Sequence, residues 1–133
     1  MKPNPIGLAA GVAVLVVTGA ACGAGDVTDR GAVESAGDAG TVTIRLIAFQ
    51  PARVEVPAGG TVTWRQEDVA THTVTSGRVD QAGGTVTATV DGTFDSGNLT
   101  QGQQFRFTFP EPGQFGFYCA IHPATMTGVV TVN

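Results

Sequence analysis

Hydrophobic and polar residues alternate with a period of two through most of residues 41–133, which is the pattern of β-strands that bury one face. In the first such segment, Val42, Ile44 and Leu46 fall on the predicted buried face. No stretch of this region has helical spacing. The alternation predicts seven or eight short strands, at residues 41–47, 54–56, 61–65, 72–75, 85–90, 105–109, 115–119 and 128–132. Short strands with closely spaced turns are typical of an all-β sandwich.

Glycine and proline mark the predicted turns between these strands. Residues 57–60 and 110–113 read PAGG and PEPG, and the segment from Gly77 to Gly92 is rich in glycine and threonine, as in a mobile hairpin. The chain carries a net charge of −4, so it lacks the basic surface that nucleic-acid binding requires. We therefore expect no nucleic-acid partner, and we expect a monomer, since nothing in the sequence indicates an oligomer.

The N-terminal region has the composition of a processing segment. A lysine at position 2 precedes an apolar run at 6–18, which is too short to span a bilayer comfortably. The run ends in Gly-Ala-Ala-Cys22, which resembles a bacterial lipoprotein signal in which Cys22 is acylated. Ordinary cleavage or an uncleaved anchor are the alternatives. Residues 1–22 are thus predicted to be a signal peptide, and the folded domain is predicted at 41–133.

Residues 23–40 contain mainly glycine, alanine and acidic residues, as expected of a flexible linker. The predicted location is outside the cytoplasmic membrane or in the periplasm, with a lipid anchor at the N-terminus. If Cys22 is lipidated or removed, Cys119 is the lone thiol of the exported domain, which is unusual and calls for an explanation. A Cys22–Cys119 disulfide is the alternative.

A cluster of potential metal ligands explains the lone thiol. Cys119, His122 and Met126 lie within eight residues of one another, between two predicted strands. The chain has one other histidine, His72. A thiolate, two imidazoles and a weakly bound axial thioether form the ligand set of blue copper sites. The four side chains therefore predict one type 1 copper ion that cycles between Cu(I) and Cu(II).

Each of these residues also has an ordinary explanation when it is taken alone. Cys119 could be a small buried side chain, Met126 could fill the core, and both histidines could be incidental. Taken together, with the Cys-x2-His spacing and no further histidine, they favour metal binding. The set leaves no open coordination position for a substrate, which argues against an enzyme.

Several motifs of the chain resemble the cupredoxin family, in particular plastocyanin and amicyanin. The motifs are FQP at 49–51, AGGTVTW at 58–64, HTVTS at 72–76, FDSG at 94–97, FPEPG at 109–113 and YCAIHP at 118–123. The resemblance implies a Greek-key sandwich and one-electron transfer through type 1 copper. It also implies His72, Cys119, His122 and Met126 as ligands. Asparagine commonly follows the first histidine in plastocyanins, and Thr73 stands at that position here, where either its backbone N–H or its hydroxyl could donate a hydrogen bond to the Cys119 sulfur.

The same resemblance implies that both imidazoles bind through Nδ1. The Nε2 edge of His122 would then lie near the surface, where a patch including Pro123 and Ala124 would dock redox proteins. A copper storage or delivery protein uses the same ligands and is the alternative function. A sandwich module without metal is a further alternative, whereas a copper oxidase or nitrite reductase needs more copper ligands than two histidines provide.

Overall fold

The computed structural model describes residues 38–133, and this part of the chain contains strands and no helix, so it has no helix that could span a membrane. The predicted signal peptide, most of the predicted linker and Cys22 lie outside the described residues. The nine strands are β1 (Gly40–Ile44), β2 (Phe49–Gln50), β3 (Arg53–Val56), β4 (Gly60–Gln66), β5 (Thr75–Ala82), β6 (Thr85–Asp95), β7 (Gln104–Phe109), β8 (Gly113–Tyr118) and β9 (Thr127–Val132).

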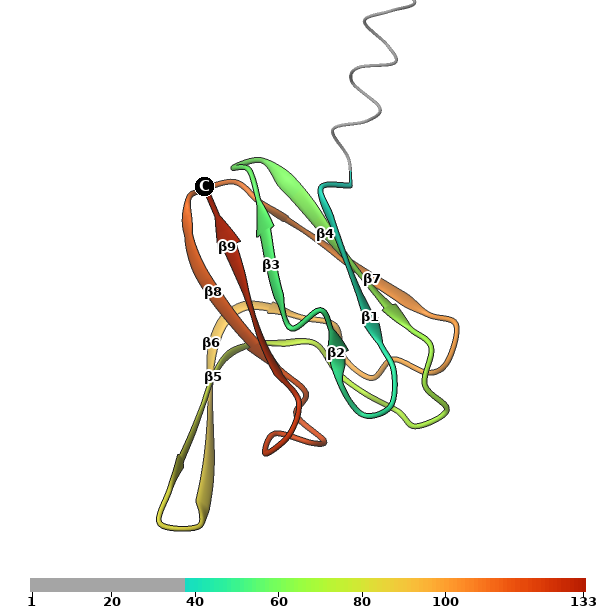
Figure 1. Cartoon of the computed structure of the whole chain (residues 1–133), viewed down its shortest axis with the longest axis vertical. Coiled ribbons are helices and arrows are strands. Elements are labelled where there is room, and N and C mark those ends of the chain that lie inside the picture. The colour runs from blue at the N-terminus through green and yellow to red at the C-terminus, as the bar shows by residue number, and fades with distance from the viewer. Residues whose placement is uncertain (1–37) are drawn as a thin grey trace, which may run out of the picture. The chain divides into compact units, whose positions relative to one another are not determined.

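The strands form two sheets that pack face to face (Figure 1). One sheet has the order β2-β1-β4-β7 and the other has the order β3-β9-β8-β5-β6. Strands β1 and β4 pair in parallel, as do β3 and β9, and the remaining pairs are antiparallel. Neighbours in each sheet are often distant in sequence, as a Greek-key sandwich requires, so the predicted fold class is confirmed.

The core consists of the inward-facing residues of both sheets. Trp64 on β4 lies at its centre, with its ring centroid 5.3 Å from that of Phe117 on β8 in the facing sheet. Phe49 meets the same Phe117 ring edge to face at 4.8 Å. Such aromatic pairs add to the stabilisation from area burial. Packing in the core therefore fixes the ends of the strands, from which the loops at the ends of the sandwich extend.

The strand predictions hold where the alternation is regular. Val42 and Ile44 of β1 are buried as predicted, and so are Val62 and Trp64 of β4. Leu46 was predicted to share the buried face with Val42 and Ile44, and this is wrong, because β1 ends at Ile44 and Leu46 is 75% exposed. The chain reverses at this point to form β2, which also raises the strand count above the predicted seven or eight.

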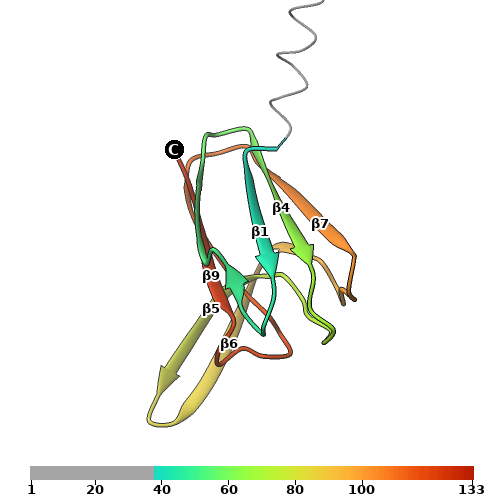
Figure 2. The same cartoon turned by 45° about the vertical axis from the view of Figure 1, so that its right-hand side comes forward.

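The strand predicted at 72–75 is also wrong at its start. His72 forms only an isolated bridge with Leu99, and β5 begins at Thr75. Strands β5 and β6 continue into a two-stranded hairpin that projects beyond the sandwich, as the two views show (Figure 2). The hairpin predicted in the glycine-rich segment is therefore present, and its tip at Gly83 and Gly84 has positive φ at both residues.

The reversal after β1 is a tight turn with unusual residues. Arg45 and Ala48 exchange two backbone hydrogen bonds, of 3.0 and 3.2 Å, across Leu46 and Ile47. Both central residues have positive φ, at 55° and 56°, as in a type I′ turn. That turn favours asparagine and glycine, and the left-handed region costs other L-residues about 1–2 kcal/mol each. The turn therefore holds two bulky residues in a strained conformation.

Replacing both turn residues (Leu46→Asn with Ile47→Gly) should stabilise the domain. Relief of left-handed strain outweighs the entropy that glycine adds to the unfolded chain, for a net gain of about 1 kcal/mol. Thermal unfolding should show a Tm higher by about 4–8 °C. A double alanine variant controls for loss of the exposed side chains, because alanine keeps a Cβ. Equal Tm values for the two double variants would contradict the strain assignment.

Candidate metal centre

Two segments far apart in sequence meet at one end of the sandwich (Figure 1). One connects β4 to β5 and carries His72, and the other connects β8 to β9 and carries Cys119, His122 and Met126. The backbone of His72 is fixed by two hydrogen bonds with Leu99, of 3.1 and 2.7 Å. These bonds hold the backbone of the segment between β4 and β5 in place, so that the His72 side chain is positioned to reach the segment between β8 and β9.

The thiol and the two imidazoles converge. Cys119 Sγ lies 3.7 Å from Nδ1 of His72 and 3.7 Å from Nδ1 of His122. The ligand atoms of these three residues all lie within 4.8 Å of one another. The two imidazole rings are tilted by 51°, with centroids 5.0 Å apart. Cys119 and His72 are fully buried and His122 is partly exposed. The structure therefore brings together three of the four predicted ligands, through the nitrogen atoms that were predicted.

The segment between β8 and β9 closes on itself through its backbone. Cys119 N–H donates to Met126 O at 3.0 Å, and Met126 N–H donates to His122 O at 3.0 Å. His122 N–H in turn donates to Cys119 O at 3.2 Å. The Met126 side chain is fully buried, in the same core cluster as Cys119. These bonds hold the backbone of all three predicted ligands of this segment in one compact turn.

Thr73 links the two segments through two different bonds. Its backbone N–H donates to Cys119 Sγ at 3.4 Å, and its hydroxyl oxygen Oγ1 accepts from Ala120 N–H at 2.8 Å. The same hydroxyl lies 3.0 Å from that of Thr75. The bond predicted from Thr73 to the sulfur is present, and the backbone N–H is the group that donates it.

Sequence reasoning missed one residue of this region, Asp68. Its Oδ2 atom lies 3.1 Å from Nε2 of His72, on the side of the ring away from Cys119. The hydrogen bonds from Ile47 N–H and then from His72 lower the pKa of Asp68, and the Val69 N–H acts in the same direction. The carboxylate is therefore ionised at neutral pH. An aspartate four residues before a candidate ligand is the sequence signal that could have suggested it.

The arrangement fits copper by its donor chemistry. A buried sulfur with an N–H donor and two imidazole nitrogens gives a soft, three-coordinate set of the His₂Cys kind. Zinc sites usually have four strong ligands, whereas the fourth residue that the segment offers here is a thioether, Met126, a weak ligand that zinc rarely uses. The acidic side chain nearby, Asp68, faces the outer nitrogen of His72 and not Cys119. Copper is the ion that these residues suit.

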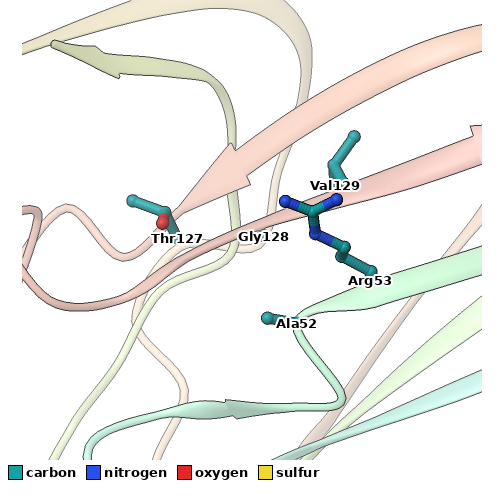
Figure 3. Close-up of a pocket in the computed structure, with 5 residues that line it drawn as sticks. All are labelled: Ala52, Arg53, Thr127, Gly128 and Val129. Carbon is teal, nitrogen blue, oxygen red and sulfur yellow. The ribbon is translucent and has the colours of Figure 1, made fainter.

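A surface pocket of about 360 Å³ lies elsewhere on the domain, where β3 and β9 begin (Figure 3). It is lined by Ala52, Arg53, Thr127, Gly128 and Val129, and none of the candidate ligands contributes to it. Arg53 is its one charged lining residue, so it offers no group of converging polar side chains. Gly128 is needed at this place for packing, because a Cβ there would overlap the ring of Phe117.

Comparison with known proteins decides the family. Residues 33–133 match the model of the copper-binding proteins of the plastocyanin/azurin family. The chain belongs to this family. It is a cupredoxin, as the resemblance of its motifs implied, and its cofactor is one type 1 copper ion. The coarse function follows from membership: this cupredoxin is a copper-binding electron-transfer protein.

Three relatives illustrate the similarity. The cupredoxin is 31% identical over 88 residues to a plastocyanin of Sambucus nigra, covering 65% of this chain and 89% of the relative. Its fold is similar to that of a purple cupredoxin from Nitrosopumilus maritimus, with a TM-score of 0.57, 29% identity, and coverage of 71% and 99%. A reduced amicyanin variant gives a TM-score of 0.56 at 25% identity, with coverage of 71% and 82%.

Proposed function

We propose that this cupredoxin carries single electrons between redox proteins outside the cytoplasmic membrane. His72, Cys119 and His122 would hold the copper ion, and the thioether of Met126 would be a further, weaker ligand. The observation that carries the proposal is the placement of two imidazole Nδ1 atoms, each 3.7 Å from one buried sulfur. When bound, the copper ion would supply the one-electron couple, Cu(II)/Cu(I).

The protein contributes a prearranged set of ligands. The Leu99 bonds fix His72, and the Thr73 bonds fix the Cys119 segment against it. A scaffold that keeps its ligands in place changes little between the two oxidation states, which suits electron transfer. Burial of Cys119 and His72 keeps water away from the donors. This enclosure supports a retained ion over the alternative of copper storage or delivery, and a carrier over an enzyme.

The partly exposed His122 provides the electron path to the surface. Ile121 is 47% exposed, Ala124 is exposed and Pro123 is partly exposed, so the residues next to His122 in sequence present uncharged side chains to the solvent. We infer that redox proteins dock here. An Ile121→Lys variant should slow electron self-exchange between the oxidised and reduced protein by roughly tenfold, measured by NMR line broadening, because the two lysines of the docking molecules would repel each other. The exposed Val69→Lys variant is the matched comparison, and equal effects would argue against a patch centred on His122.

For the N-terminus we propose residues 1–22 as a signal peptide, with Cys22 as a lipidated first residue, and 23–40 as a linker to the domain. The Gly-Ala-Ala-Cys22 sequence after an apolar run supports this. Mass spectrometry of the protein from bacterial membranes should show an N-terminal peptide beginning at Cys22 with acyl chains attached. An unmodified cysteine, or a start beyond it, would rule the anchor out.

The copper proposal is tested by adding Cu(II) to the copper-free domain. We expect an intense visible absorption from sulfur-to-copper charge transfer, and a rise in Tm because the ion binds only the folded state. The Cys119→Ser variant should remain folded and lose the band, since the thiolate is its source. A band of full intensity in Cys119→Ser would contradict the assignment.

The Met126→Leu variant tests the axial role of Met126. Met126→Leu conserves volume in the core and should cost less than about 1.5 kcal/mol of stability. The visible band should persist in this variant, while its position and the reduction potential should change, because the axial ligand tunes both. If both stay as in the parent protein, Met126 is only a core residue, and the other three ligands are unaffected.

A further inference from the structure

One carboxylate oxygen joins the surface of this domain to its buried histidine. Asp68 Oδ2 lies 2.9 Å from the backbone nitrogen of Ile47 and 3.1 Å from Nε2 of His72. The other oxygen, Oδ1, accepts from Val69 N–H at 2.9 Å. The backbone of Asp68 is itself held, because its N–H donates to Gln66 Oε1 at 2.8 Å. Three hydrogen bonds thus fix the carboxylate and a fourth fixes its backbone, so its position is not accidental.

The turn that supplies the Ile47 N–H is the strained one. Its two residues have positive φ and expose their side chains, Leu46 by 75% and Ile47 by 46%. Backbone strain of this kind persists only when surrounding contacts fix it, and it clusters at functional sites. The bond from Ile47 N–H to Asp68 is one such contact from outside the turn. The strained turn and the carboxylate therefore hold each other in place.

The contact with His72 has a consequence for the ring. His72 is fully buried, so its Nε2–H needs a partner within the protein, and Asp68 is the one that the described structure supplies. A carboxylate there keeps the proton on Nε2 and leaves the Nδ1 lone pair free, on the side of Cys119. Carboxylate–histidine pairs of this kind fix the ring orientation of metal ligands.

We propose that Asp68 is a positioning residue that couples the exposed Leu46–Ile47 turn to the buried ligand His72, and that it lowers the reduction potential of the bound copper. The proposal rests on copper ligation by His72. It makes the turn part of the site: a partner that contacts Leu46 or Ile47 acts on the bond that orients the histidine. A negative charge behind the ring favours the more positive oxidation state, which gives the direction of the potential.

The contact is tested first without copper. In the copper-free protein, NMR should show the Nε2–H proton of His72 as a slowly exchanging, low-field resonance. Asp68→Ala should lose this resonance to fast exchange and speed the exchange of the Ile47 amide about tenfold or more. Glu67→Gln is the control, because it removes an adjacent exposed charge and should leave both signals unchanged. An unchanged His72 resonance in Asp68→Ala would overturn the positioning role, and an unchanged Ile47 amide would overturn the coupling.

The second measurement is the reduction potential of the copper-loaded protein. Losing the carboxylate should weaken Cu(II) binding relative to Cu(I) by about tenfold, which is a rise of about 59 mV for one electron. Asp68→Asn keeps the shape and removes the charge, so it should show a rise even if Asp68→Ala unfolds. A rise no larger than that of Glu67→Gln would overturn the proposal. This outcome differs from failure of the proposed function, in which the parent protein would show no type 1 copper spectrum.

Discussion

The clamp between Thr73 and the segment that begins at Cys119 is the contact on which the site depends. The Thr73 N–H reaches the Cys119 sulfur, and the Ala120 N–H returns to the Thr73 hydroxyl. These two bonds join residues that are 46 and 47 positions apart. Without these two bonds, the loop that carries His72 and the loop that carries His122 would not be fixed relative to each other. With them, both Nδ1 atoms reach the same sulfur at equal distance.

The clamp depends in turn on the sandwich. Thr73 lies just before β5 and Cys119 just after β8, and these strands pair at Thr75 and Tyr118. The register of β5 with β8 therefore fixes the position of the Thr73 segment relative to the Cys119 segment. Packing of Trp64 against Phe117 fixes the opposite sheet on β8. The packed core thus fixes the two sheets, and the register of β5 with β8 fixes the two segments that carry the ligands. This explains how loops can hold the ligand side chains with little freedom.

Much of the fold could be predicted from the sequence, because burial follows alternation in strands such as β1 and β3. The failures have physical causes. Leu46 continues the alternation in sequence, but the chain turns before it, and no local signal announces a turn made of leucine and isoleucine. The strand predicted from His72 starts later, because His72 bonds to Leu99 and not to a sheet neighbour. Alternation reports side-chain polarity and does not report which backbone partner is available.

The candidate site, like the fold, could be predicted only in part from the sequence. Residue chemistry sufficed to select His72, Cys119 and His122, because few other residues of the chain could bind a soft metal. It did not single out Asp68: its place four residues before His72 was the one signal in the sequence, and its role arises from a contact across a turn. Nor could it decide between the hydroxyl and the backbone N–H of Thr73 as the donor to sulfur. Contacts made by the backbone carry no signature in the identity of the side chain.

The most direct test of the convergence of these ligands is electron paramagnetic resonance of the domain loaded with one equivalent of Cu(II). We expect a single species with a narrow parallel hyperfine splitting, the signature of copper bound strongly to a thiolate in a type 1 site. A wide splitting of ordinary tetragonal copper, or a signal that chelators remove at once, would show that His72, Cys119 and His122 do not bind the ion together.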